Sequence, residues 1–174
     1  MSKTLIICDI QPEYSGWFSF DIKKFCQYLN RAKNNYNIHY FYNGYDTLGM
    51  VDETELINWL LDNGLKPNTL DKIKFTDKGY GFLREAMDND VSDQKIIKTL
   101  QEMYASQIFD SRDLPEKKNK VGENSIFWNE SFDIIRQYSE VIFTGGSVDA
   151  CLKELILGAK ALRVKYEFQE SYLY

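Results

Sequence analysis

The sequence contains few of the residues that build disulfide frameworks and metal sites. Its 174 residues include three cysteines and a single histidine, His39. Cys8, Cys26 and Cys151 are odd in number and form no C-x-x-C pair, which predicts neither a disulfide framework nor a zinc finger. One histidine cannot supply a His-rich metal site, so only a carboxylate site for Mg²⁺ or Mn²⁺ stays open. We therefore expect no cofactor and no resident metal.

The sequence also lacks an excess of positive charge and a long apolar run. Its net charge of −5 argues against nucleic-acid binding, which needs clustered Lys and Arg to neutralise phosphates. No run reaches the roughly 20 apolar residues of a membrane span, and Asp9 interrupts the first apolar block, unlike a signal or transit peptide. We expect a cytoplasmic protein that contacts no membrane and binds a small-molecule substrate. A homo-oligomer stays open.

What is present is a regular alternation of strand and helix patterns over a length typical of one domain. Continuous apolar runs, which are typical of buried parallel strands, are separated by stretches with helical spacing. We predict strands at 5–8, 38–42, 73–76, 141–144 and 163–168, helices at 21–33, 52–63, 80–87, 92–105, 131–138 and 147–162, and a loop at 110–129. The alternation predicts a single α/β domain over residues 1–174. Its sheet is doubly wound, mainly parallel and Rossmann-like, with helices on both faces.

Ligands of such sheets bind beyond the carboxyl ends of the strands. Polar or glycine-containing segments follow four of the predicted strands. The candidate site residues in these segments are Asp9, Gln11, Asn43, Lys78, Tyr80, Gly146 and Ser147. Gln11 either orients a neighbouring group or belongs to the turn before Pro12.

Cys151 is a candidate nucleophile, because it falls in the first turn of a helix that directly follows a strand. Unpaired backbone N–H groups and the helix dipole favour a thiolate there. Asp9 would accept the thiol proton and Lys78 would stabilise the anion, as in covalent catalysis. The alternative is a core role, because Cys151 shares a helical stripe with Leu155 and free cysteines are often small core residues. Cys8 and Cys26 are expected in the core.

Two blocks of the sequence carry a family resemblance. The strand followed by Asp9-Ile10-Gln11 resembles the D-x-Q opening of the isochorismatase-like cysteine hydrolases, and Phe143 to Leu152 is similar to that family's strand–TG–x–x–x–D–x–C–V segment. The resemblance implies a doubly wound α/β fold, Asp9 as base, Cys151 as nucleophile, and a cis peptide bond at Gly146-Ser147. The family's lysine corresponds to Lys78, which follows a predicted strand, with Lys120 as the alternative. The metal-binding histidines of the nicotinamidase branch are absent.

Shorter blocks, Tyr42-Asn43-Gly44, Asp77 to Phe82 and Asp110 to Asp113, are similar to a set of uncharacterised bacteriophage proteins and imply no known activity. The first hypothesis is therefore a small cysteine hydrolase that acts on an amide or related C–N bond. The second is a catalytically inactive binding or accessory protein on the same fold. The third is a Mg²⁺-dependent phosphoesterase built on Asp9, Glu13 and Asp149.

Overall fold

A computed structural model describes residues 3–44, 51–79, 81–114 and 125–174 of the chain. The chain forms two compact units. We call the first, residues 1–80, 140–152 and 166–174, the sheet unit, and the second, residues 81–139 and 153–165, the helical unit. The units are interleaved in sequence, and the single-domain assignment over residues 1–174 stays a prediction.

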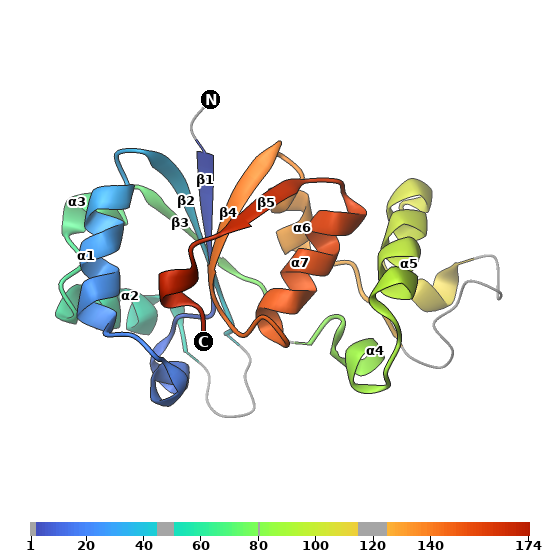
Figure 1. Cartoon of the computed structure of the whole chain (residues 1–174), viewed down its shortest axis with the longest axis horizontal. Helices are drawn as coiled ribbons and strands as arrows, with labels where there is room; N and C mark the ends of the chain where they lie inside the picture. The colour runs from blue at the N-terminus through green and yellow to red at the C-terminus, as the bar shows by residue number, and fades with distance from the viewer. Residues whose placement is uncertain (1–2, 45–50, 80, 115–124) are drawn as a thin grey trace. The chain divides into compact units, whose positions relative to one another are not determined.

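The chain forms a five-stranded parallel sheet in the order β3-β2-β1-β4-β5 (Figure 1). Its strands are β1 (Lys3–Cys8), β2 (Tyr36–Tyr42), β3 (Ile73–Asp77), β4 (Glu140–Gly145) and β5 (Lys165–Phe168). The first three strands step outward from the centre, and the chain then returns to place β4 on the other side of β1. This order confirms the predicted doubly wound, Rossmann-like α/β fold.

The register of the central strands brings their carboxyl ends to one edge of the sheet. Cys8 at the end of β1 pairs with Phe41 of β2 on one side and with Gly145 of β4 on the other. Tyr42 pairs in turn with Asp77 of β3. The residues that follow these four strands are thereby brought to the same edge, which is where the sequence predicted a site.

One face of the sheet packs on α1 (Ile22–Ala32) and α2 (Glu53–Asp62). Because strand side chains alternate between faces, Leu5 and Ile7 of β1 point into this core and Cys8 points to the opposite face. The buried cluster on the α1 side contains Leu5, Ile7, Phe25, Cys26, Leu29, Ile38, Tyr40, Leu56 and Leu60.

Local capping explains where α1 and α2 begin. The Asp21 side chain accepts a hydrogen bond from the Lys23 amide, and the Asp52 side chain accepts one from the Glu55 amide. Each carboxylate satisfies a backbone donor that has no partner within its helix. Gly64 follows α2 with a φ of 94°, the left-handed conformation that glycine adopts readily at helix ends.

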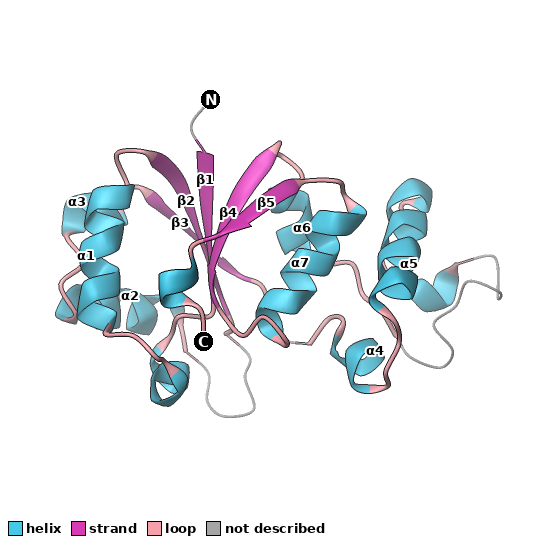
Figure 2. Ribbon diagram, viewed as in Figure 1, coloured by secondary structure: helices cyan, strands magenta, loops and turns pink. Residues whose placement is uncertain are grey.

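The helical unit contains α4 (Arg84–Asp88), α5 (Asp93–Ser106), α6 (Glu130–Ile135) and the part of α7 (Cys151–Ala161) from Lys153 onward. Figure 2 distinguishes these helices from the strands. Gly158 of α7 lies against the Phe132 ring, which an added Cβ would meet at 2.1 Å. The buried Glu154 carboxylate accepts a hydrogen bond from the Leu83 amide at 2.9 Å.

Within the described residues, the remaining short elements are α3 (Pro67–Leu70) and the 3₁₀ turns η1 (Pro12–Trp17), η2 (Ser111–Asp113) and η4 (Glu170–Tyr172). The turn η2, together with a bridge between Asp110 and Phe127, lies in a segment that we predicted as loop. None of the helices in the described part of the chain has the length and apolarity that a membrane crossing requires.

Three elements begin two or more residues later than the sequence predicts, and each of them follows a left-handed residue. The helix predicted from residue 80 begins at Arg84 because Gly81 has a φ of 73°. The last strand begins at Lys165 because Arg163 has a φ of 59°. The helix predicted from residue 147 begins at Cys151, because Gly145 and Gly146 are both left-handed and a turn follows them.

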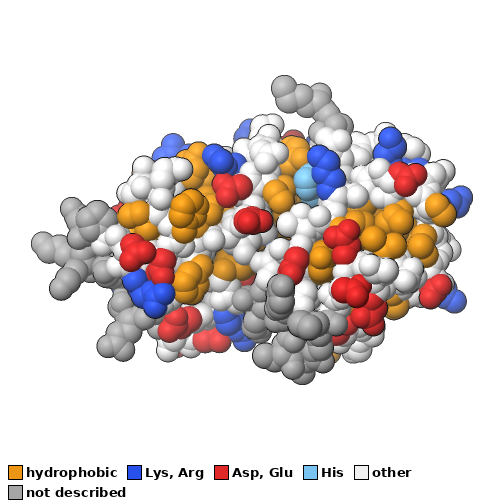
Figure 3. Space-filling model, turned by 180° about the vertical axis from the view of Figure 1, so that it is seen from behind, with side chains coloured by type: hydrophobic (Ala, Val, Ile, Leu, Met, Phe, Trp, Pro, Cys, Tyr) orange, Lys and Arg blue, Asp and Glu red, His pale blue; other side chains and the backbone are white. Residues whose placement is uncertain are grey.

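Charged side chains of both signs are interspersed with apolar ones on the face shown in Figure 3. No broad basic patch is visible among the coloured residues of that face. This distribution agrees with the net charge of −5.

Candidate active site at the carboxyl edge of the sheet

Asp9 directly follows β1 and has an unusual backbone conformation. Its φ is 51°, a left-handed value that Asp tolerates better than most residues but that still costs roughly 1 kcal/mol or more. Its amide donates to the Phe41 carbonyl at 2.9 Å. The Tyr174 hydroxyl donates to the Asp9 carbonyl at 2.6 Å, and the Tyr40 hydroxyl donates to the Ile10 carbonyl. Two tyrosines thus hold the consecutive carbonyls of this strained turn.

The Asp9 carboxylate forms a buried ion pair with Lys78. Asp9 Oδ2 lies 2.9 Å from Lys78 Nζ, and the two side chains are 2% and 0% exposed. Lys78 directly follows β3, where its amide donates to the Tyr42 carbonyl. Removing water from two charges is costly, so such a pair is retained only where its geometry is good, and removing one partner leaves a buried charge.

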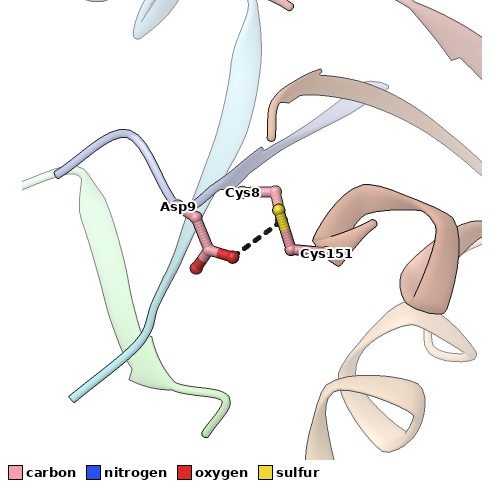
Figure 4. Close-up of side chains that lie close together, drawn as sticks. All are labelled: Cys8, Asp9 and Cys151. Atoms are coloured by element: carbon pink, nitrogen blue, oxygen red, sulfur yellow. Dashed lines mark hydrogen bonds between the residues drawn. The ribbon is translucent and has the colours of Figure 1, made fainter. Parts of the chain in front are cut away.

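Two thiols lie beside this carboxylate, as Figure 4 shows. The Sγ atoms of Cys8 and Cys151 and one Asp9 carboxylate oxygen lie within 4.8 Å of one another. The Cys8 thiol donates to Asp9 Oδ2 at 3.6 Å. Cys8 is fully buried, whereas Cys151, the first residue of α7, is partly exposed. Asp9, Lys78 and Cys151 therefore converge, as the sequence analysis required.

The glycines that end β4 make room for these groups. Gly145 and Gly146 have φ values of 73° and 66°. An added Cβ on Gly146 would lie 3.1 Å from Cys8 Sγ and 3.2 Å from Cys151 Sγ. An added Cβ on Gly145 would lie 2.4 Å from the Cys8 carbonyl oxygen. The clash with backbone excludes a side chain at Gly145, and the left-handed backbone and the close sulfurs strain one at Gly146.

Ser147 belongs to the turn that starts α7. Its carbonyl accepts hydrogen bonds from the Ala150 and Leu152 amides at 3.1 Å, and its hydroxyl accepts from the Asp149 amide. The cis peptide bond that the resemblance implied at Gly146-Ser147 is absent, since this bond lies within the described residues and no cis bond occurs there.

Gln11 and Asn43 bind each other. Gln11 Oε1 accepts from the Asn43 amide at 2.8 Å, while Gln11 Nε2 donates to the Asn43 carbonyl at 3.2 Å. Asn43 Nδ2 also donates to the Tyr14 hydroxyl. These contacts join the turn after β1 to the end of β2, and a substrate-binding role for either residue stays a prediction. Tyr80 and Lys120, also candidates from the sequence, lie outside the described residues.

Burial sets the electrostatics of the cluster. It raises the pKa of the Cys8 thiol well above the ordinary value, and the hydrogen bond with Cys151 and the nearby Asp9 charge act in the same direction. Burial also raises the pKa of the Tyr174 hydroxyl, with the same neighbouring groups contributing. Cys8 and Tyr174 are therefore neutral donors at physiological pH.

Sequence reasoning assigned no site role to Cys8 or Tyr174. Cys8 was placed in the core, which its burial confirms, but it also contacts the Asp9 carboxylate. Its position next to Asp9 was the available signal. Tyr174 reaches the site through the fold alone, since its amide donates to the Gly146 carbonyl at 3.4 Å.

The chemistry of the donor set favours proton transfer over metal binding. Cys8, Asp9 and Cys151 form the group of metal-ligand type found in the described part of the chain. However, Lys78 already neutralises the carboxylate, and its ammonium would oppose a cation. The carboxylates of the phosphoesterase hypothesis do not form such a group within the described residues, where Glu13 accepts from Gln11 and Asp149 is exposed.

No family model, curated protein or solved structure matches this chain. The isochorismatase-like resemblance and the similarity to bacteriophage proteins therefore stay predictions. The case for a function depends on the geometry of the carboxyl edge.

Proposed function

We propose that the chain is a cysteine hydrolase that acts on an amide or related C–N bond of a small molecule. The observation that carries the proposal is the convergence of a carboxylate, an ammonium and a partly exposed thiol at the carboxyl edge. Asp9 Oδ1 is buried and has no hydrogen-bond partner within the described residues. Such an atom needs a ligand, a water molecule or a proton, and a base in a catalytic cycle receives a proton.

In the proposed cycle, Asp9 takes the proton of the Cys151 thiol and the resulting thiolate attacks the carbonyl carbon. Lys78 stabilises the negative charge that develops near it, as a fixed cation does in a site with little water. The C–N bond then breaks, the leaving nitrogen takes the proton from Asp9, and an acyl thioester remains. Asp9 next deprotonates a water molecule that attacks the thioester, which releases the acid and restores the Cys151 thiol.

Release of ammonia or amine from a panel of small amides tests this proposal. We expect Cys151→Ala to reduce the rate at least about 10³-fold, because loss of a nucleophile removes the covalent pathway. Cys26→Ala is the matched control, since Cys26 is buried between α1 and α2 and its thiol donates to the Leu60 carbonyl. Unchanged hydrolysis by Cys151→Ala would refute the proposal.

A binding or accessory role on the same fold is the second candidate, and the burial of the cluster favours it. Cys8, Asp9 and Lys78 are at most 3% exposed, and a buried ion pair also occurs in proteins without turnover. Iodoacetamide at neutral pH separates the two candidates. The hydrolase requires that Cys151 be labelled much faster than Cys8 and Cys26. Equal and slow labelling of all three thiols would favour the binding protein.

A further inference from the structure

We propose that Cys8 and Cys151 are a redox-active pair whose thiols are converted to a reversible disulfide by peroxides. The two cysteines come from opposite ends of the chain, one at the end of β1 and one at the start of α7. Their sulfurs nevertheless lie within 4.8 Å of each other. The proposed hydrolase uses only Cys151 and leaves Cys8 without a role.

Gly146 keeps the space beside both sulfurs free of a side chain. An added Cβ there would approach the two sulfurs to 3.1 and 3.2 Å, so a larger residue would press on both thiols. The third cysteine, Cys26, bonds to a backbone carbonyl in the core between α1 and α2. Of the three cysteines, Cys8 and Cys151 are therefore the two whose sulfurs are close enough to form a disulfide.

The difference in exposure gives the two cysteines different parts in the reaction. The partly exposed Cys151 attacks the peroxide oxygen as a thiolate, which breaks the O–O bond and yields a sulfenic acid and water or an alcohol. The buried Cys8 then attacks the Cys151 sulfur, the S–S bond forms and the S–OH bond breaks. The Cys8 proton passes through Asp9 Oδ2, which accepts its hydrogen bond, to the leaving hydroxide as water. Overall, two thiols lose two electrons to one peroxide and two protons go into the products.

Backbone pairing restricts which side of the pair moves. Cys8 is hydrogen bonded into the sheet between Phe41 and Gly145, so its main chain is fixed on both sides. Cys151 is the first residue of a helix, where backbone groups have fewer partners and opening is easier. The sulfurs therefore come together through a shift of the first turn of α7.

The regulatory consequence rests on the proposed function. A disulfide at Cys151 removes the nucleophile, so peroxide would stop hydrolysis and a dithiol reductant would restore it. The disulfide also protects Cys151 from irreversible oxidation, since without a nearby thiol a sulfenic acid proceeds to sulfinic acid. Disulfide formation itself needs no substrate and is measured without any hydrolase assay.

The test treats the reduced 174-residue chain with about one equivalent of hydrogen peroxide and maps disulfides by peptide mass spectrometry. We expect a Cys8–Cys151 link that dithiothreitol reverses, and one thiol still titratable. Cys26→Ser should form the same reversible Cys8–Cys151 link but with no thiol left to titrate, whereas Cys8→Ser should form no disulfide and accumulate Cys151 sulfinic acid. The same oxidation in urea should yield mixed pairings, which shows that the native fold selects the pair even if Cys8→Ser folds poorly.

Native wild-type protein that yields no Cys8–Cys151 link, or links Cys26 as often, overturns the inference. If the link forms but no amide is hydrolysed, the redox pair stands and the proposed function fails. If hydrolysis depends on Cys151 but no link forms, the proposed function stands and only this inference fails.

Discussion

The residues before and after Cys8 in the chain belong to two chemically different regions of the sheet unit, an apolar core and a buried ion pair. Toward the N-terminus, Leu5 and Ile7 pack on α1 in a core of apolar side chains. At the carboxyl edge, Asp9, which lies two residues after Ile7, forms a buried pair of opposite charges with Lys78. Removing an apolar side chain loses contacts and leaves a cavity, whereas removing one charge leaves its partner buried and unpaired. Substitutions in the two regions should therefore differ in kind.

The largest effect is expected for Lys78→Met. It leaves the Asp9 carboxylate buried without its cation, which should lower the free energy of unfolding by about 3–5 kcal/mol. Urea denaturation measures the change. Lys98→Met is the control, because the Lys98–Glu102 pair is 3.9 Å long with a lysine side chain 66% exposed, and it should cost less than about 1 kcal/mol. Adding Asp9→Asn to Lys78→Met should recover stability, and a further loss would contradict a charge-based explanation.

Leu29→Ala tests the apolar side of the comparison. Leu29 of α1 is fully buried in the core cluster, so its truncation should cost about 2–5 kcal/mol in the free energy of unfolding. Under conditions where the variant stays folded, the rate at which iodoacetamide labels Cys151 should match that of the wild type. A changed labelling rate would mean that the two regions are coupled.

Tyr174→Phe tests how much the hydrogen bond to the left-handed turn at Asp9 contributes to the stability of the carboxyl edge. It leaves the Asp9 carbonyl without the hydroxyl that donates at 2.6 Å, which should cost about 1–2 kcal/mol. Tyr172→Phe is the matched control, since the Tyr172 hydroxyl donates to the Lys24 carbonyl at an exposed position and at 3.5 Å. Equal urea midpoints for the two variants would show that the Asp9 carbonyl needs no such donor.

His39, on β2, should give the smallest effect, and only in acid. Burial, together with the Lys74 charge, lowers the pKa of His39 to about 4, below the ordinary value of about 6.5. Between these values the unfolded chain binds more protons than the folded one, so stability falls as pH drops from 6.5 to 4. His39→Gln should lose this part of the pH dependence, and identical slopes of unfolding free energy against pH would contradict it.

The parts of the fold that the sequence predicted are those with local causes. The uninterrupted apolar run of β1 and the Asp52 cap of α2 act within a few residues, and both were found. The convergence of Asp9, Lys78 and Cys151 was predictable because each follows a strand and parallel strands end at one edge, while their catalytic roles stay a prediction. The proximity of Cys8 to Cys151 was missed because the apolar run of β1 marks Cys8 as one more core residue. Tyr174 was missed because no local pattern ties it to Asp9.

The reciprocal bonds between Gln11 and Asn43 have a consequence for the dynamics of this edge. A glutamine side chain ends in a primary amide, with one acceptor and two donors, and here it binds both the N–H and the C=O of Asn43. The Gln11 side chain therefore takes the place of one more backbone peptide group in the hydrogen-bond ladder with β2, beyond Asp9, where β1 has ended. The Asn43 amide proton, although it lies beyond the end of β2, should exchange with solvent as slowly as those of a strand interior. That proton is a reporter of when this edge of the sheet opens.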